Sequence, residues 1–156
     1  MKHPILGQQK AIYFYASTWN TVVLVHASVL KFGQNLTWEQ SILDSAIFNF
    51  IYAALALSFW YTCKYSSLTT LRIVKLVENH LFAAAFSSSI WLGLSYAILA
   101  KLFGDHEAYI AFLKNSIIWR GLIGVLFYFL IIALYYIYIY SLNLKEQSVK
   151  QAELKT

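Results

Sequence analysis

Residues 117–140, IIWRGLIGVLFYFLIIALYYIYIY, form a long apolar stretch without proline that runs into the charged residues 141–156, SLNLKEQSVKQAELKT. A helix of about 20 apolar residues is long enough to cross the roughly 30 Å hydrocarbon core of a bilayer. We therefore expect a transmembrane helix here. Because no proline or glycine separates the two parts, we also expect this helix to continue into the charged segment.

Three more apolar runs precede this stretch, at residues 11–30, 42–63 and 80–100. Each has the length of a membrane helix, whereas strands of a membrane barrel are about half as long and alternate in polarity. The first run is too long for the apolar part of a signal peptide, and no small-residue cleavage site follows it. The chain is therefore predicted to be an all-α membrane protein with four transmembrane helices. Residues 1–140 would form the membrane domain, and residues 141–156 would begin a cytoplasmic linker helix.

The composition agrees with a membrane protein. Of the 156 residues, 60% are hydrophobic and only 12% are charged, which is unusual for a soluble domain of this size. The single cysteine, Cys63, excludes an intrachain disulfide and is expected to be a buried or lipid-facing thiol. The net charge is +5, but no cluster of basic residues with interleaved aromatics indicates a nucleic-acid surface. We expect the lipid bilayer as a partner and no nucleic acid.

The basic residues are unevenly distributed between the connections. Eight of them lie in the N-terminal segment, the middle connection and the tail: Lys2, Lys10, Lys64, Arg72, Lys75, Lys145, Lys150 and Lys155. The other two connections carry three: Lys31, Lys101 and Lys114. Because cytoplasmic connections are enriched in Lys and Arg, both termini are predicted to be cytoplasmic. The chain would be a multi-pass protein of the cytoplasmic (inner) membrane.

The middle connection, residues 64–79, is polar and basic. A short interfacial helix is predicted within it from its spaced apolar residues, Leu71, Val74, Leu76 and Val77. We expect His80 to open the third transmembrane helix as a solvated or capping residue.

Polar residues of three predicted helices fall in the same half of the membrane. They are His26, Asp44, Asn49 and Arg120. A charged side chain in hydrocarbon costs about 2.5 to 3.5 kcal/mol on insertion scales, so such residues usually pair or face water. Two arrangements of Asp44 and Arg120 remain open: the two side chains pair, or each reaches the interface separately. His26 is either a hydrogen-bonding packing residue or a group that responds to pH or to a ligand. These four residues are the candidate sensing cluster.

No motif of a catalytic or metal site is present. The sequence contains no P-loop, no G-x-S-x-G, no paired catalytic carboxylates and no His or Cys spacing typical of a metal site. We therefore predict no catalytic residue, no cofactor and no metal in this chain. Gly121 and Gly124 form only a weak helix-dimerisation signal, because they are spaced as GxxG and not as GxxxG.

Several stretches resemble the membrane sensor region of LytS/YehU-like sensor histidine kinases, in particular the four-helix kind of Bacteroidota. The similar stretches are residues 2–7 (KHPILG), 44–49 (DSAIFN), 91–93 (WLG), 112–116 (FLKNS) followed by Trp119 and Arg120, and 152–155 (AELK). These are loose patterns, although they span most of the chain. None of them is a catalytic motif.

The resemblance implies a two-component receptor that works as a homodimer. Its partner would be a LytTR-type response regulator, reached through a kinase core that binds ATP and Mg²⁺ and follows this chain. The phospho-acceptor segment of the family is absent from these residues, so the chain by itself is expected to have no kinase activity. In the tail, a heptad-like spacing is formed by Leu142, Lys145, Val149, Ala152 and Thr156. The alternative is a complete small four-helix membrane protein, such as a transporter or membrane-complex subunit, which would need ionisable groups near mid-membrane or broken helices.

Overall fold

The computed structural model describes residues 3–66 and 72–154. Four helices make up nearly all of this part of the chain, and no strand is present in it. They are α1 (Gln9–Gly33), α2 (Trp38–Tyr65), α3 (Ile73–Leu102) and α4 (Glu107–Glu153). The predicted all-α fold with four helices in this order is confirmed. The predicted positions Lys2, Leu71, Lys155 and Thr156 lie outside the described residues.

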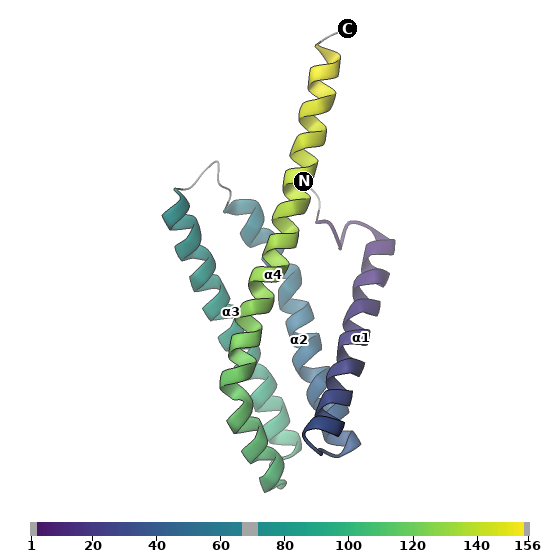
Figure 1. The fold of residues 1–156 in the computed structure, drawn as a ribbon, viewed down its shortest axis with the longest axis vertical. Coiled ribbons are helices and arrows are strands. Elements are labelled where there is room, and N and C mark those ends of the chain that lie inside the picture. The colour runs from purple at the N-terminus through teal and green to yellow at the C-terminus, as the bar shows by residue number, and fades with distance from the viewer. Residues whose placement is uncertain (1–2, 67–71, 155–156) are drawn as a thin grey trace.

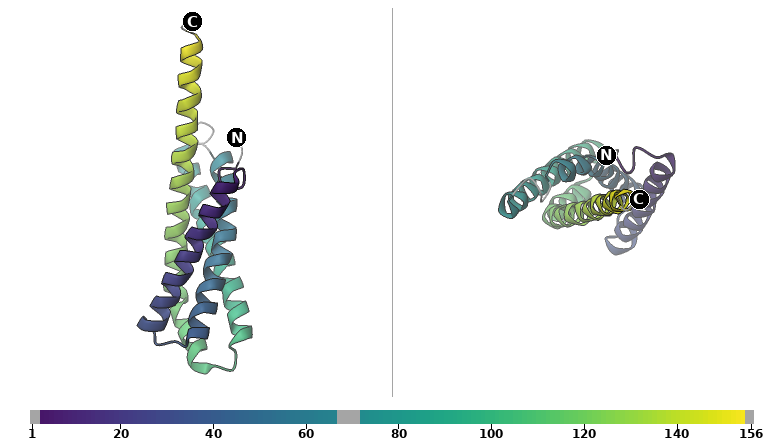
Figure 2. Two further views of the ribbon diagram at one scale, coloured as in Figure 1. Left: turned by 90° about the vertical axis from the view of Figure 1, so that its right-hand side faces the viewer. Right: turned by 90° about the horizontal axis from the view of Figure 1, so that it is seen from above.

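The four helices run alternately up and down (Figure 1). The α1–α2 and α3–α4 connections lie at one end, which we call the loop end, and both termini lie toward the opposite end. α2 is the central helix, because it packs against each of the other three. α1 packs against α2 alone, whereas α3 and α4 also pack against each other. Figure 2 shows that α4 extends well beyond the other helices.

Local sequence signals explain the turn between α1 and α2. Asn35 has φ 54°, a left-handed conformation that asparagine tolerates better than most residues. Thr37 then caps α2: its hydroxyl accepts from the Gln40 amide at 3.2 Å, and the Gln40 side chain accepts from the Thr37 amide. This turn sets where α2 begins, and so it sets which residues of α2 face α1.

Two of the predicted connections are shorter in the structure. The residues expected to form a separate interfacial helix, from Ile73 onward, are the first turns of α3. Likewise α4 begins at Glu107, ten residues before the predicted apolar span at residue 117. Membrane helices extend past the apolar run that identifies them, because polar residues at the interface are equally compatible with helix. The prediction of a separate interfacial helix was therefore wrong, whereas the predicted apolar span 117–140 lies within α4.

Three helices, α2, α3 and α4, are long and apolar enough to cross a membrane by length and composition, within the residues that the structure describes. This composition is that of a membrane protein. α1 does not reach the same apolar character, so the expectation of four such helices was too high by one. Its apolar run is interrupted by polar side chains, among them Thr18, Asn20, Thr21, His26 and Ser28.

The interior is held by aromatic side chains that bond to the backbone of neighbouring helices. Tyr52 donates to the Gly124 carbonyl at 2.6 Å, Trp91 to the Phe48 carbonyl at 2.6 Å, and Tyr135 to the Ala56 carbonyl at 3.2 Å. Each bond satisfies a buried polar group and joins two helices at once. The helix arrangement is therefore fixed by specific polar contacts as well as by packing.

Gly124 allows α4 to approach α3 closely. A Cβ atom at this position would lie 2.6 Å from the Trp91 ring, a distance that real Cβ atoms essentially never show. At Gly121 the same atom would meet the Leu92 side chain at 3.4 Å, which is ordinary contact. Both glycines therefore face α3 of the same chain.

Candidate functional site

Asp44 of α2 and Arg120 of α4 form an ion pair. The two terminal nitrogens of Arg120 donate to the two carboxylate oxygens of Asp44 at 2.9 and 3.0 Å. Asp44 has no exposed surface and Arg120 is 7% exposed. Of the two arrangements that the sequence left open, the structure therefore shows the pair. Bidentate bonding of this kind is among the stronger protein hydrogen bonds.

Neighbouring side chains complete the surroundings of the pair. The Tyr109 hydroxyl donates to Asp44 Oδ2 at 2.8 Å, and Arg120 Nε donates to Ser116 Oγ at 2.9 Å. The ring of Phe48 covers the guanidinium, with 4.0 Å from Cζ to the ring centroid. Buried charges are tolerated when their hydrogen-bonding capacity is met in this way.

His26 of α1 is bonded to Asn49 of α2, with 2.9 Å between His26 Nδ1 and Asn49 Nδ2. The same Asn49 nitrogen lies 2.7 Å from the Ser45 carbonyl oxygen, which can only accept. This nitrogen is therefore the amide NH₂ group, and it donates one hydrogen to each partner. His26 Nδ1 accepts, so a neutral His26 carries its proton on Nε2.

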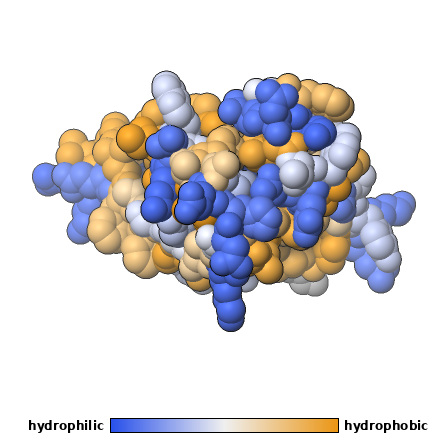
Figure 3. Space-filling view, turned by 90° about the horizontal axis from the view of Figure 1, so that it is seen from below, coloured by the Kyte–Doolittle hydropathy of each residue, from blue (hydrophilic) through white to orange (hydrophobic). Residues whose placement is uncertain are grey.

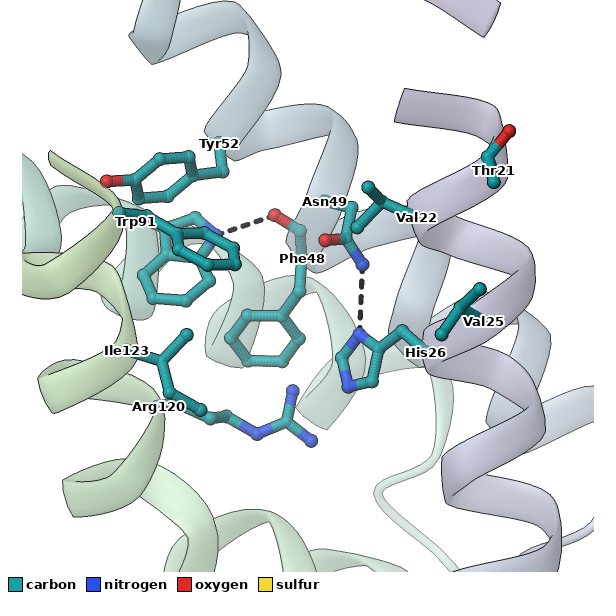
Figure 4. A pocket seen from close by; sticks show the side chains of 11 residues that line it. Thr21, Val22, Val25, His26, Phe48, Asn49, Tyr52, Trp91, Arg120 and Ile123 are labelled. Atoms are coloured by element: carbon teal, nitrogen blue, oxygen red, sulfur yellow. Dashed lines mark hydrogen bonds between the residues drawn. The ribbon is translucent and has the colours of Figure 1, made fainter. Parts of the chain in front are cut away.

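Arg120 of the ion pair and the hydrogen-bonded His26 and Asn49 lie at a groove between α1 and α4, which we call the α1–α4 groove (Figure 4). Its inner hollow has a volume of about 350 Å³ and is lined by residues of all four helices: Thr21, Val22, Val25, His26, Phe48, Asn49, Tyr52, Trp91, Arg120, Ile123 and Phe127. A second hollow of about 390 Å³ adjoins it toward the loop end and shares His26, Arg120 and Ile123 with it. The groove exists because α1 and α4 each pack on α2 but not on each other.

The loop end itself is polar. Figure 3 shows hydrophilic side chains across the middle of this end, with apolar side chains around them. The second hollow includes polar residues near this end, namely Gln34, Asn115 and Ser116. The groove therefore grades from an almost wholly apolar inner part to a more polar outer part.

The structure brings all four predicted site residues to this groove or beside it. His26, Asn49 and Arg120 line it, and Asp44 lies behind Arg120. Sequence reasoning missed Tyr109, because the predicted fourth span began after it. The buried residues Tyr109, Leu113 and Arg120 are spaced by four and seven residues and so lie along one face of α4, so a longer predicted helix would have placed Tyr109 with Arg120.

His80 is not the solvated residue that was expected. It is 5% exposed and lies within α3, and its two ring nitrogens bond the hydroxyls of Tyr128 at 2.9 Å and Tyr136 at 2.7 Å. Tyr136 in turn donates to the Ser66 carbonyl at 2.6 Å. His80 therefore joins α3 to α4 near the end of the bundle opposite the loop end, which we call the terminal end. The expectation failed because it placed the start of the third helix at His80.

The described residues contain no group of three or more His, Cys, Asp or Glu side chains that could hold a metal ion. Cys63 is buried, and its thiol lies 3.9 Å from the Ile132 carbonyl oxygen. The α1–α4 groove offers hydrogen-bond donors beside apolar and aromatic walls. Such an arrangement is suited to binding a ligand.

In comparisons with known proteins, the chain matches no family model, no curated protein and no solved structure.

Proposed function

We propose that this chain is the sensory and dimerisation module of a two-component sensor histidine kinase in the cytoplasmic membrane. A signal received in or near the bilayer would pass along α4 to a C-terminal kinase core, and from there to a LytTR-type response regulator. The observation that carries this proposal is the continuity of α4. One helix of 47 residues contains Arg120 at the groove and ends beyond the bundle at Glu153.

The exposed part of α4 supports a role in transmission. Tyr135 is the last buried residue of the helix, and all residues from 143 to 154 are exposed. An isolated helical segment of this length is marginal in water, so its partner would be another chain. In the proposed homodimer, the heptad-like residues of two tails would face each other.

We propose that α1 is a fourth transmembrane helix despite its polar side chains. Hydroxyls and an amide on this helix donate to carbonyls four residues earlier: Thr18 to Phe14, Asn20 to Ala16, Thr21 to Ser17 and Ser28 to Leu24. Donors that are satisfied within the helix cost less to place against lipid. With four passes, the distribution of basic residues favours cytoplasmic termini.

A small four-helix subunit of a transporter or membrane complex is the alternative, and the buried Asp44–Arg120 pair is the observation that favours it. Ionisable residues inside a membrane often mark transport pathways. Against it, α2, α3 and α4 run unbroken through the described bundle, whereas transporter sites commonly use discontinuous helices.

Dimerisation through the tail can be tested on this chain in liposomes. Val149→Cys should form a disulfide-linked dimer under mild oxidation. Gln147→Cys, which lies about 200° around the helix, should form much less. The buried Cys63 provides a low background. Equal cross-linking at both positions would contradict a specific helix pair.

Signalling can be tested in the chain that carries the output domain, whose reading frame is expected to contain a phospho-acceptor histidine segment. Inserting two residues after Ser141 turns the downstream helix by about 200° and should change autophosphorylation severalfold. Inserting seven residues leaves the phase within about 20° and should preserve it. The kinase proposal fails if no such segment follows, or if both insertions behave alike.

A further inference from the structure

The inner hollow of the α1–α4 groove has aromatic walls. Phe48, Tyr52, Trp91 and Phe127 line it together with aliphatic side chains. Trp91 and Tyr52 contact each other edge to face at 4.9 Å between ring centroids, and Trp91 meets Phe48 in the same way at 5.4 Å. These contacts fix the rings that form the walls. Walls of this kind favour a flat, apolar ring over a flexible chain.

One side of this hollow carries hydrogen-bond donors that no described residue uses. His26 Nδ1 accepts from Asn49, so the Nε2–H on the other side of the ring is free to donate. Arg120 has five N–H groups, of which three serve Asp44 and Ser116, and two remain. Figure 4 shows the His26 ring between Asn49 and the Arg120 guanidinium. A ligand oxygen placed there would accept from both residues.

The charge of the hollow is already balanced. Asp44 neutralises Arg120. The other ionisable side chains among the described residues that line the hollow are His26 and Tyr52. An anionic ligand would have to lose its hydration without gaining an unpaired cation, which is costly. The hollow therefore favours an uncharged ligand whose oxygen accepts hydrogen bonds.

The hollow also opens sideways. Val25 of α1 and Ile123 of α4 line it from opposite sides and are 59% and 46% exposed. In a membrane-embedded bundle, exposed apolar residues at this position face lipid. A ligand could then enter from the bilayer between α1 and α4 and leave an apolar tail outside.

From these observations we infer that the α1–α4 groove binds a prenylated quinone of the membrane. The quinone ring lies against Phe48, Tyr52 and Trp91, one carbonyl oxygen accepts from His26 Nε2–H and Arg120, and the prenyl chain passes between Val25 and Ile123. This inference deepens the proposed function, because it names the chemical class that the sensor would detect. Binding is measured without any output domain, so its failure is distinguishable from failure of the kinase proposal.

The test uses the chain in nanodiscs and 2-methyl-1,4-naphthoquinone with one isoprenyl chain as the probe. Saturable quenching of tryptophan fluorescence reports binding, since Trp91 lies in the groove. His26→Phe removes one donor and should weaken binding by about 3- to 10-fold. His106→Phe, at an exposed residue outside the groove, should leave it unchanged.

A second pair of variants tests the location. Val25→Phe fills the groove and should weaken binding at least 10-fold. Leu24→Phe, at the neighbouring exposed residue that does not line the groove, should have no effect. Thermal unfolding of each variant without the probe checks that it is folded.

Competition decides between membrane molecules with acceptor oxygens. Dioleoylglycerol, with ester carbonyls, and oleate, with a carboxylate, should displace the probe only weakly. The inference is overturned if quenching does not saturate, if His26→Phe and Val25→Phe bind like their controls, or if dioleoylglycerol or oleate at the same concentration as the probe restores half or more of the quenched fluorescence.

Discussion

Tyr109 and Arg120 lie on one face of α4 and hold the same carboxylate: Tyr109 donates to Asp44 Oδ2 at 2.8 Å, and Arg120 donates to both of its oxygens. α4 is thereby joined to α2 through a fully buried acid. The attachment lies next to the α1–α4 groove, because Arg120 also lines that groove. One guanidinium thus both lines the groove and attaches α4 to α2.

Breaking the ion pair from one side should be costly. Asp44→Leu or Arg120→Leu leaves a buried charge without its partner and should lower the free energy of unfolding by about 3 to 5 kcal/mol. The double variant should lose markedly less than the sum of the two, because no charge remains. Denaturant unfolding in mixed micelles, followed by circular dichroism, measures the coupling. Additive losses would show that the two residues act independently.

Tyr109→Phe should destabilise the chain by about 1.5 to 3 kcal/mol, since it removes a hydrogen bond to a charged group and leaves the ring in place. Tyr13→Phe is the control, because Tyr13 is 73% exposed. Its effect should stay within about 0.5 kcal/mol. If both variants unfold alike, the Tyr109 hydroxyl does not support Asp44.

Gly124 of α4, which faces α3, and Gly93 of α3 should respond oppositely to alanine. Gly124→Ala forces a Cβ against Trp91 and should cost about 1 to 3 kcal/mol. Gly93→Ala adds a Cβ with nothing within 4 Å and should stabilise α3 by up to about 1 kcal/mol. Thermal unfolding of both variants in the same detergent measures the contrast. Loss of stability in both would contradict the close approach at Gly124.

His80→Phe should destabilise the terminal end of the bundle by about 1 to 3 kcal/mol. The Tyr128 hydroxyl has no exposed surface, and His80 is its one partner among the described residues, so the substitution leaves a buried donor unsatisfied. Adding Tyr128→Phe removes that donor and should recover part of the loss. His106→Phe serves as the matched control. If Tyr128→Phe instead lowers the stability of the His80→Phe variant further, the hydrogen bond between Tyr128 and His80 does not contribute.

The number and order of the helices could be predicted because each contains a mostly apolar stretch of about 20 residues, although that of α1 is more polar than the other three. The approach of His26, Asp44 and Arg120 at the loop end could also be predicted. In helices that alternate in direction, the end of α1 lies at the same membrane depth as the beginnings of α2 and α4. Both inferences need only the position of a residue along its helix. Depth is the quantity that the length of an apolar run encodes.

The partners of Tyr109, His80 and Trp91 could not be predicted, because they depend on the rotation of each helix. The membrane part of α4 is apolar or aromatic on nearly every face, so its sequence does not show which side turns inward. The prediction that α1 would be as apolar as the other three helices failed because polar residues interrupt its apolar run. Its Asn20 and Thr21 lower its apolar character, yet both are satisfied by carbonyls of the same helix.

Gly124 is the point at which α4 is held from two sides, by Trp91 packed against it and by Tyr52 bonded to its carbonyl oxygen. Between Gly124 and Glu153 the helix rises by about 44 Å at about 1.5 Å per residue. Over the first part of this length α4 is still attached to α2 and α3, through Tyr128, Tyr135 and Tyr136. The free part begins after Tyr136 and is about 26 Å long, so a tilt of about 5° there displaces its far end by about 2.3 Å.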